Sequence, residues 1–270
     1  MGFKVVENEI RTIWAPMDTT STPTLYNGQL VQVTGDGVGP LAIAGGVADT
    51  TNKQVIYGVV VGSNNRTPVY DSTYSTDKIT AVITQAAQTA RDWTGQEGVW
   101  VKGDPQCMVQ IAVIDARTVL SAPIYNATIG VAPTLLTVTT GSSTGLGFTS
   151  NACEFTPVAD ICTSYCRSGA NAGIYRVSDD TSTTVETNDL AFPQDIAVGD
   201  TFVRAGMRPV GKSFVQLNST SGAVGLFFDN AVGLVTDYFI IDVLELDLRV
   251  SGKEKVNFRF HPAHFDAVRA

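Results

Sequence analysis

The stretch LELDLRVSGKEKVNFRF, residues 244–260, contains the clearest structural signal in the chain. Apolar and polar residues alternate over 244–250 and again over 256–260, as they do in strands that bury one face. Residues 251–254, between them, have the composition of a turn. The stretch therefore predicts an antiparallel hairpin with one buried face near the end of the sequence.

Short apolar runs of the same kind recur throughout the chain. Examples are residues 30–33, 55–61, 109–114 and 201–203, and turns rich in Gly, Asn, Asp and Pro separate them. Val and Thr are abundant, and their β-branched side chains favour strands. The pattern predicts a mainly β protein built of β-barrel or β-sandwich units.

One short helix is expected in the C-terminal half, over residues 156–169. Thr156 is a suitable N-cap, Pro157 suits the first helical position, and Gly169 suits the end. Between them, apolar residues recur at helical spacing: Val158, Ile161, Cys162, Tyr165 and Cys166.

Composition divides the chain into four predicted segments. Residues 1–24 hold short polar residues and two prolines, which favours an extended N-terminal arm. An N-terminal β domain is expected over 25–138 and a C-terminal β-rich domain over 151–270. Between the two domains, the Gly, Ser and Thr of residues 139–150 predict a linker or long loop.

The charge composition argues against several classes of partner. Only 16% of the 270 residues are charged, the formal net charge is −8, and there are only seven lysines. A nucleic-acid footprint or a polybasic membrane patch is difficult to build from these residues. No stretch of about 18 apolar residues occurs either. We therefore expect no nucleic-acid partner and no membrane partner.

The residues that usually carry chemistry form no convincing site. Cys153, Cys162 and Cys166 lack the spacing of a zinc motif, so we expect them in the core, with a disulfide from Cys153 and a zinc site as alternatives. The only histidines, His261 and His264, are expected at the surface. We predict no catalytic residue, no metal ligand, no cofactor and no small-molecule substrate, and hence no enzyme.

A series of glycine-led and proline-containing strands runs through the first 130 residues. In order, its pieces are GQLV (28–31), AIAGG (42–46), IYGVVV (56–61), GVWVKG (98–103) and VLSAPIY (119–125). This order resembles the strand pattern of tailed-bacteriophage capsid decoration (cement) proteins. The C-terminal half departs from the shorter members of that family.

The resemblance implies a structural virion protein on the capsid exterior, made in the host cytoplasm. Its partners would be the major capsid protein and copies of itself, commonly as a homotrimer, and it would clamp neighbouring capsid subunits together. A phage tail, baseplate or fibre component, or a surface module that binds host glycans, is the alternative, and an enzyme such as a carbohydrate hydrolase is a third.

Two groups of residues are candidates for contacts with other chains, because cement proteins need strands and arms that pair with neighbours. The first lies in the predicted arm, for which a disordered tail is the alternative: Trp14, Pro16, Met17 and Pro23. The second is the polar face of a predicted C-terminal strand, expected to take part in strand pairing: Glu245, Asp247 and Arg249.

Overall fold

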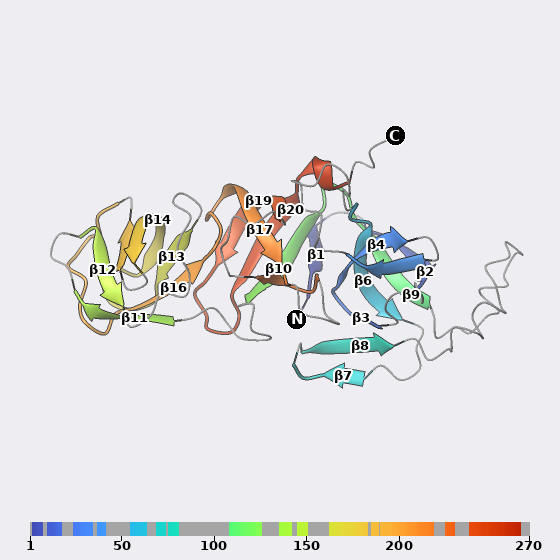
Figure 1. Ribbon diagram of the computed structural model, residues 1–270, viewed down its shortest axis with the longest axis horizontal. Helices are drawn as coiled ribbons and strands as arrows, with labels where there is room; N and C mark the ends of the chain where they lie inside the picture. Colours follow the sequence, from blue (N-terminus) through green and yellow to red (C-terminus); the bar gives the residue numbers. More distant parts are fainter. Residues whose placement is uncertain are drawn as a thin grey trace, which may run out of the picture.

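The computed structural model describes residues 2–7, 10–17, 24–34, 37–41, 55–63, 69–73, 75–80, 108–125, 135–141, 145–150, 162–182, 185–188, 190–218, 225–229 and 238–265. Within these ranges the regular structure is almost all β-strand, and the one helix is the 3-10 turn η2 (Pro262–His264). The predicted mainly β class is confirmed. No helix in this part of the chain is long and apolar enough to cross a membrane. The strands form three units that lie in a row (Figure 1).

The middle unit is a six-stranded sheet drawn from both ends of the sequence. In spatial order its strands are β1 (Lys4–Glu7), β10 (Val119–Tyr125), β18 (Phe228–Asp229), β17 (Gly211–Leu217), β19 (Phe239–Asp247) and β20 (Lys255–Phe260). Because β20 also pairs with β10, the last five of these strands form a closed ring. Phenylalanine rings fill its interior, with edge-to-face contacts such as Phe228–Phe258 at 4.8 Å between ring centroids.

The predicted C-terminal hairpin is confirmed as β19 and β20, but its first strand ends at Asp247, so Arg249 and the other residues of 248–250 precede the turn outside the strand. These strands pair antiparallel, and Lys253 N–H donates to Val250 O in the turn, where Gly252 has a φ of 73°. The inward and outward alternation is regular along β20. In β19 the register shifts between Val243 and Glu245, which leaves Leu244 exposed, so the sequence alternation is interrupted at a bulge.

The first unit lies between β1 and β10 in the sequence. Its main sheet has the order β2 (Arg11–Pro16), β9 (Met108–Val113), β6 (Gly58–Ser63), β4 (Leu30–Thr34) and β5 (Gly37–Pro40). An isolated parallel bridge from Met17 to Val38 joins its two edges, so this sheet also curls round its own core. A smaller sheet lies beside it: β3 (Thr24–Tyr26), β8 (Thr76–Thr80) and β7 (Val69–Asp71).

The third unit lies between β10 and β17 in the sequence and is a closed barrel. Its strands, in order, are β11 (Leu135–Thr140), β12 (Gly147–Ser150), β15 (Val185–Asn188), β14 (Gly173–Ser182), β13 (Thr163–Cys166) and β16 (Thr201–Ala205). Side chains fill it, with Phe148 stacked on Phe202 at 4.2 Å between centroids. It is therefore a packed core, with no channel through these side chains.

The helix expected over 156–169 is wrong where the structure describes that segment. Residues Thr163–Cys166 form β13, which pairs with β14 on one side and β16 on the other. Cys162 and Cys166 share a face in a helix and in a strand alike, since four residues is close to one helical turn and equal to two strand repeats. Their spacing therefore did not discriminate between the two. Residues 156–161 lie outside the described ranges.

The predicted division into an arm, two domains and a linker is also corrected. The arm contains β1 and β2, which pair with β10 and β9. The linker contains the end of β11 and all of β12, which pair with each other. The predicted separation of residues 25–138 from residues 151–270 is wrong as well, because β10 of the first range pairs with β18 and β20 of the second. A chain that leaves the middle sheet twice and returns each time has no single cut point.

Apolar and polar contacts join the three units. One core cluster contains Val59 of the first unit, Phe258 of the middle unit and Val203 of the barrel. On the barrel side, Arg167 donates to Glu254 Oε1 at 2.6 Å and to Leu248 O, and the Glu254 side chain is fully buried. The units therefore do not pack as independent bodies.

Candidate interaction site

The residues predicted for the N-terminal arm belong to the folded first unit. All six residues of β2 pair with β9. Met17 is fully buried in the core of this unit and Pro16 is half-buried. Trp14 points outward and is 47% exposed. Of the predicted contact residues in the described part of the arm, Trp14 is thus the one most open to a partner, and Pro23 lies outside the described ranges.

The charged residues of the C-terminal strand interact within their own hairpin. Asn257 of β20 donates to Glu245 Oε2 at 2.9 Å. Arg249 forms a two-pronged ion pair with Asp247, with both N–O distances at 2.9 Å, and this pair holds the pKa of the Asp247 carboxyl at about 2. In this structure these groups therefore pair with neighbours two residues or one strand away, and their pairing with another chain stays a prediction.

The two described cysteines, Cys162 and Cys166, are buried, as expected for core residues. Burial raises the pKa of the Cys166 thiol. Cys107 and Cys153 lie outside the described ranges. Within those ranges no group of three or more His, Cys, Asp and Glu side chains is placed to hold a metal ion.

The expectation of a surface position is wrong for His264. This side chain is 3% exposed, and its Nε2 accepts the Ile240 N–H at 2.9 Å. The pKa of His264 is lowered to about 4, mainly by burial and in part by the nearby His261, while the hydrogen bond with Ile240 opposes the shift. His261 itself is exposed and caps the 3-10 turn. A proline-containing turn folds the second imidazole back over Phe239 and Phe260, and no pattern in the sequence announces this.

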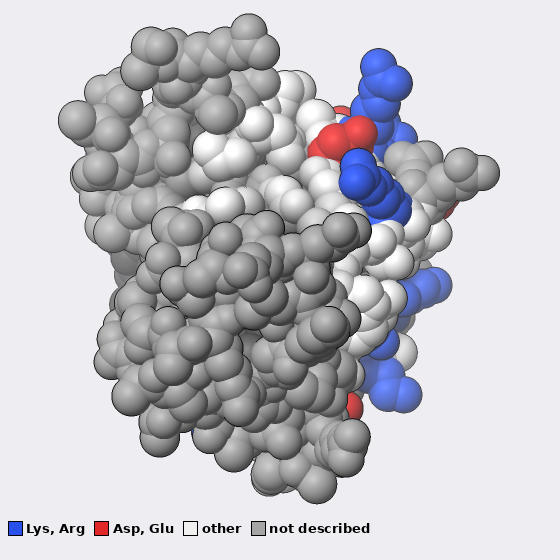
Figure 2. All heavy atoms as spheres, turned by 90° about the vertical axis from the view of Figure 1, so that its right-hand side faces the viewer, with Lys and Arg blue, Asp and Glu red and all other residues white. Residues whose placement is uncertain are grey.

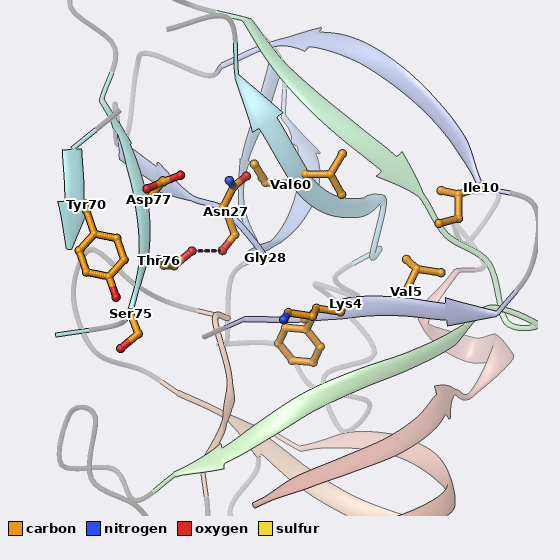
Figure 3. A pocket seen from close by; sticks show the side chains of 12 residues that line it. Lys4, Val5, Ile10, Asn27, Gly28, Val60, Tyr70, Ser75, Thr76 and Asp77 are labelled. Atoms are coloured by element: carbon orange, nitrogen blue, oxygen red, sulfur yellow. Dashed lines mark hydrogen bonds between the residues drawn. The ribbon is translucent and has the colours of Figure 1, made fainter. Parts of the chain in front are cut away.

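A groove of about 500 Å³ lies between the middle unit and the first unit (Figure 3). Strand β1 forms one side, and the hairpin of β7 and β8 with the turn before β4 forms the other. Three of its large apolar side chains are exposed, with exposed fractions of 43% for Ile10, 43% for Val61 and 62% for Tyr70. Exposed apolar groups gathered in one hollow are typical of an interaction site.

Beside the groove, two backbone segments approach each other closely at Gly2 and Gly28. Gly2 and Gly28 both have positive φ, and a Cβ on Gly28 would lie 2.8 Å from Gly2 Cα. The contact allows Phe3 N–H to donate to Gly28 O at 2.7 Å. Beside it, the Thr76 hydroxyl donates to Asn27 O at 2.9 Å, and Asn27 Oδ1 is buried with no hydrogen-bond partner among the described residues (Figure 3). The small residues at this junction therefore fix where β1 lies relative to the first unit.

A second hollow, of about 260 Å³, adjoins the groove at Lys4, which lines both. Its other basic residues are Lys253 and Lys255, so three of the seven lysines meet here. Glu254 also lines it, but its side chain is fully buried against Arg167. On the face drawn in Figure 2, most of the described surface is uncharged, and lysine and arginine side chains gather along one margin.

Sequence reasoning missed both hollows, because their residues come from segments far apart in the chain. The one available signal was Lys253 in the predicted turn with Lys255 directly after it, and Lys4 joins them only through the pairing of β1 with β10. Comparison with known proteins adds no identification: no family model, no curated protein and no solved structure matches this chain.

Proposed function

We propose that this chain is a structural virion protein that binds the outer surface of a bacteriophage capsid and stabilises contacts between major capsid subunits. It would act without catalysis, in several copies and as a homotrimer, after synthesis in the host cytoplasm. The observation that carries the proposal is the elongated row of three β units joined by buried contacts (Figure 1). A clamp between neighbouring subunits needs such a shape, because it must reach from one to the next.

The joints between the units support this role on mechanical grounds. A clamp transmits force only if its parts do not rotate against one another. Here the buried Arg167–Glu254 pair ties the barrel to the middle unit, and Ile56 N–H donates to His264 O across the other joint. Packed cores resist small displacements, unlike the wetter interfaces that permit domain motion.

The open margins of the sheets supply the means of attachment. Strand addition holds a partner through main-chain hydrogen bonds and needs no reactive group. Among the described strands, β7 is at the edge of its sheet, and β1 pairs with β10 alone. Attachment by shape and backbone pairing is what the proposed role requires.

The test is the position and copy number of the chain on purified virus particles. Particles of the virus that encodes it are imaged by cryo-electron microscopy, with and without a bulky fusion partner on the chain, and copies are counted by quantitative mass spectrometry. The proposal expects many copies over the head shell. A few copies at one vertex would assign the chain to the tail, baseplate or fibre, and absence from particles would end the virion proposal.

A further inference from the structure

We propose that the open edge of β1 receives an extended segment of another polypeptide. Acidic side chains at one end of that segment would lie against Lys4, Lys253 and Lys255. The inference rests on the proposed function in one respect, since it assigns that segment to a subunit of the virus shell. It specifies the site of attachment on this chain and the chemistry of the partner.

The first step is the direction of the main-chain groups in β1. Phe3 N–H donates to Gly28 O, on the side away from β10. Main-chain groups alternate sides along a strand, so those of Val5 point the same way, whereas those of Lys4 face β10. Among the described residues no hydrogen bond is made by Val5 on that side. The groove borders this edge (Figure 3).

The second step is the lining of the groove, which suits an extended backbone with apolar side chains. Ile10, Val61 and Tyr70 expose apolar surface around the open edge. The four residues of β1 span roughly 13 Å at strand spacing. An added strand of that length would use the free N–H and C=O of Val5 and cover part of the apolar wall.

The third step is the charge at one end. Lys4 lies opposite Ser121 and Lys255 opposite Pro123, on the two sides of β10, so both side chains rise from the same face. Two of the acidic groups near them are already engaged, Glu254 with Arg167 and Asp247, opposite Lys255, with Arg249, while Asp77 lines the groove that Lys4 also lines. The hollow therefore presents net positive charge on a chain whose formal net charge is −8. Carboxylates on the partner complement it.

The probe is a synthetic peptide of about ten residues, in which Val alternates with Thr and one end carries a run of glutamates; about ten residues extend to roughly 33 Å. A matched peptide carries lysines instead. Binding to the full chain is measured by fluorescence anisotropy at low and moderate salt. We expect the glutamate peptide to bind more tightly than the lysine peptide, and its advantage to shrink as salt rises.

Three variants separate the parts of the proposal. Val5→Pro removes the N–H that faces the groove and should weaken binding at least about fivefold, the value of a typical net hydrogen bond. Val5→Ala, the matched control, keeps that N–H and should bind nearly as the original chain does. The double variant Lys253→Glu, Lys255→Glu should reverse the preference between the two peptides.

Hydrogen exchange gives a measurement that does not depend on whether Val5→Pro folds. On adding the glutamate peptide, exchange at the Val5 amide should slow markedly, while the Lys4 amide, which faces β10, should change little. Unchanged exchange at Val5, or equal affinity for the two peptides, overturns the inference. So does loss of self-association in Val5→Pro, because the occupant would then be a second copy of this chain.

The outcome on particles distinguishes this inference from the proposed function. If the original chain and a folded Val5→Pro variant decorate shells equally, the shell role stands and the β1 edge is not the attachment site. If neither binds shells but the peptide results hold, the groove takes extended acidic segments and the virion role is wrong.

Discussion

The buried histidine makes the stability of this protein depend on pH in a defined window. His264 Nε2 accepts the Ile240 N–H at 2.9 Å, so the folded state needs the imidazole neutral, with its proton on Nδ1. Protonation would add a hydrogen to Nε2, so that this new N–H would face the Ile240 N–H, and two donors would oppose each other. The ring lies between Phe239 and Phe260, at 5.1 and 5.8 Å between centroids, where a charge is poorly solvated.

The size of the effect follows from the two pKa values. The imidazole has a pKa of 6.5 in the unfolded reference and about 4 when folded. Because the folded pKa is the lower one, the unfolded chain takes up the proton first as the pH falls. The free energy of unfolding therefore keeps the full contribution of the neutral His264 above pH 6.5 and loses it progressively towards pH 4. The total is about 3 kcal/mol, with about 2 kcal/mol lost between pH 7 and pH 5.

The assay is urea unfolding followed by circular dichroism at several pH values from 7 to 4. His264→Gln offers an amide oxygen to the Ile240 N–H but cannot titrate, so its stability should change far less across this window. His261→Gln is the matched comparison: it leaves the burial of His264, the main cause of the pKa shift, in place, so it should keep most of the pH dependence and lose only the part that His261 contributes. If His264→Gln loses as much stability between pH 7 and pH 5 as the original chain, the reasoning is wrong.

Three further predictions concern packing and the joint between units. Gly58→Ala places a Cβ 2.4 Å from the backbone of β9 and should lower the free energy of unfolding by about 1–3 kcal/mol, whereas Gly62→Ala meets only a side chain at 3.3 Å and should cost less; equal urea midpoints would contradict this. Arg167→Met leaves the buried Glu254 carboxylate unpaired and should lower the free energy of unfolding by about 3–5 kcal/mol in the same measurement. The double variant Arg167→Met, Glu254→Gln should recover part of that loss. If the double variant instead loses the sum of what the two single variants lose, the ion pair does not stabilise the joint. The buried Cys166 should react with a thiol reagent in native protein many times more slowly than in urea, and equal rates would show that the barrel is open.

Local patterns predicted the elements whose stabilising contacts lie nearby in sequence. The C-terminal hairpin is the clearest case, because alternation and a glycine-containing turn specify both strands and their connection. The same reasoning failed at Thr163–Cys166, where the spacing of two cysteines satisfies both a helix and a strand. What decided between them is the pairing of β13 with a strand on each side, one of them about 40 residues further along the chain.

The sequence by itself determined the β class, the hairpin and the burial of the two described cysteines, since each depends on side-chain periodicity or apolar composition. Tertiary structure decided which strands share a sheet, why residues 2–7 and 10–17 are folded, how His264 is buried, and where the groove lies. Those features need β1 and β10 to meet strands more than 100 residues away, and a period of two along a strand says nothing about which neighbour it will have.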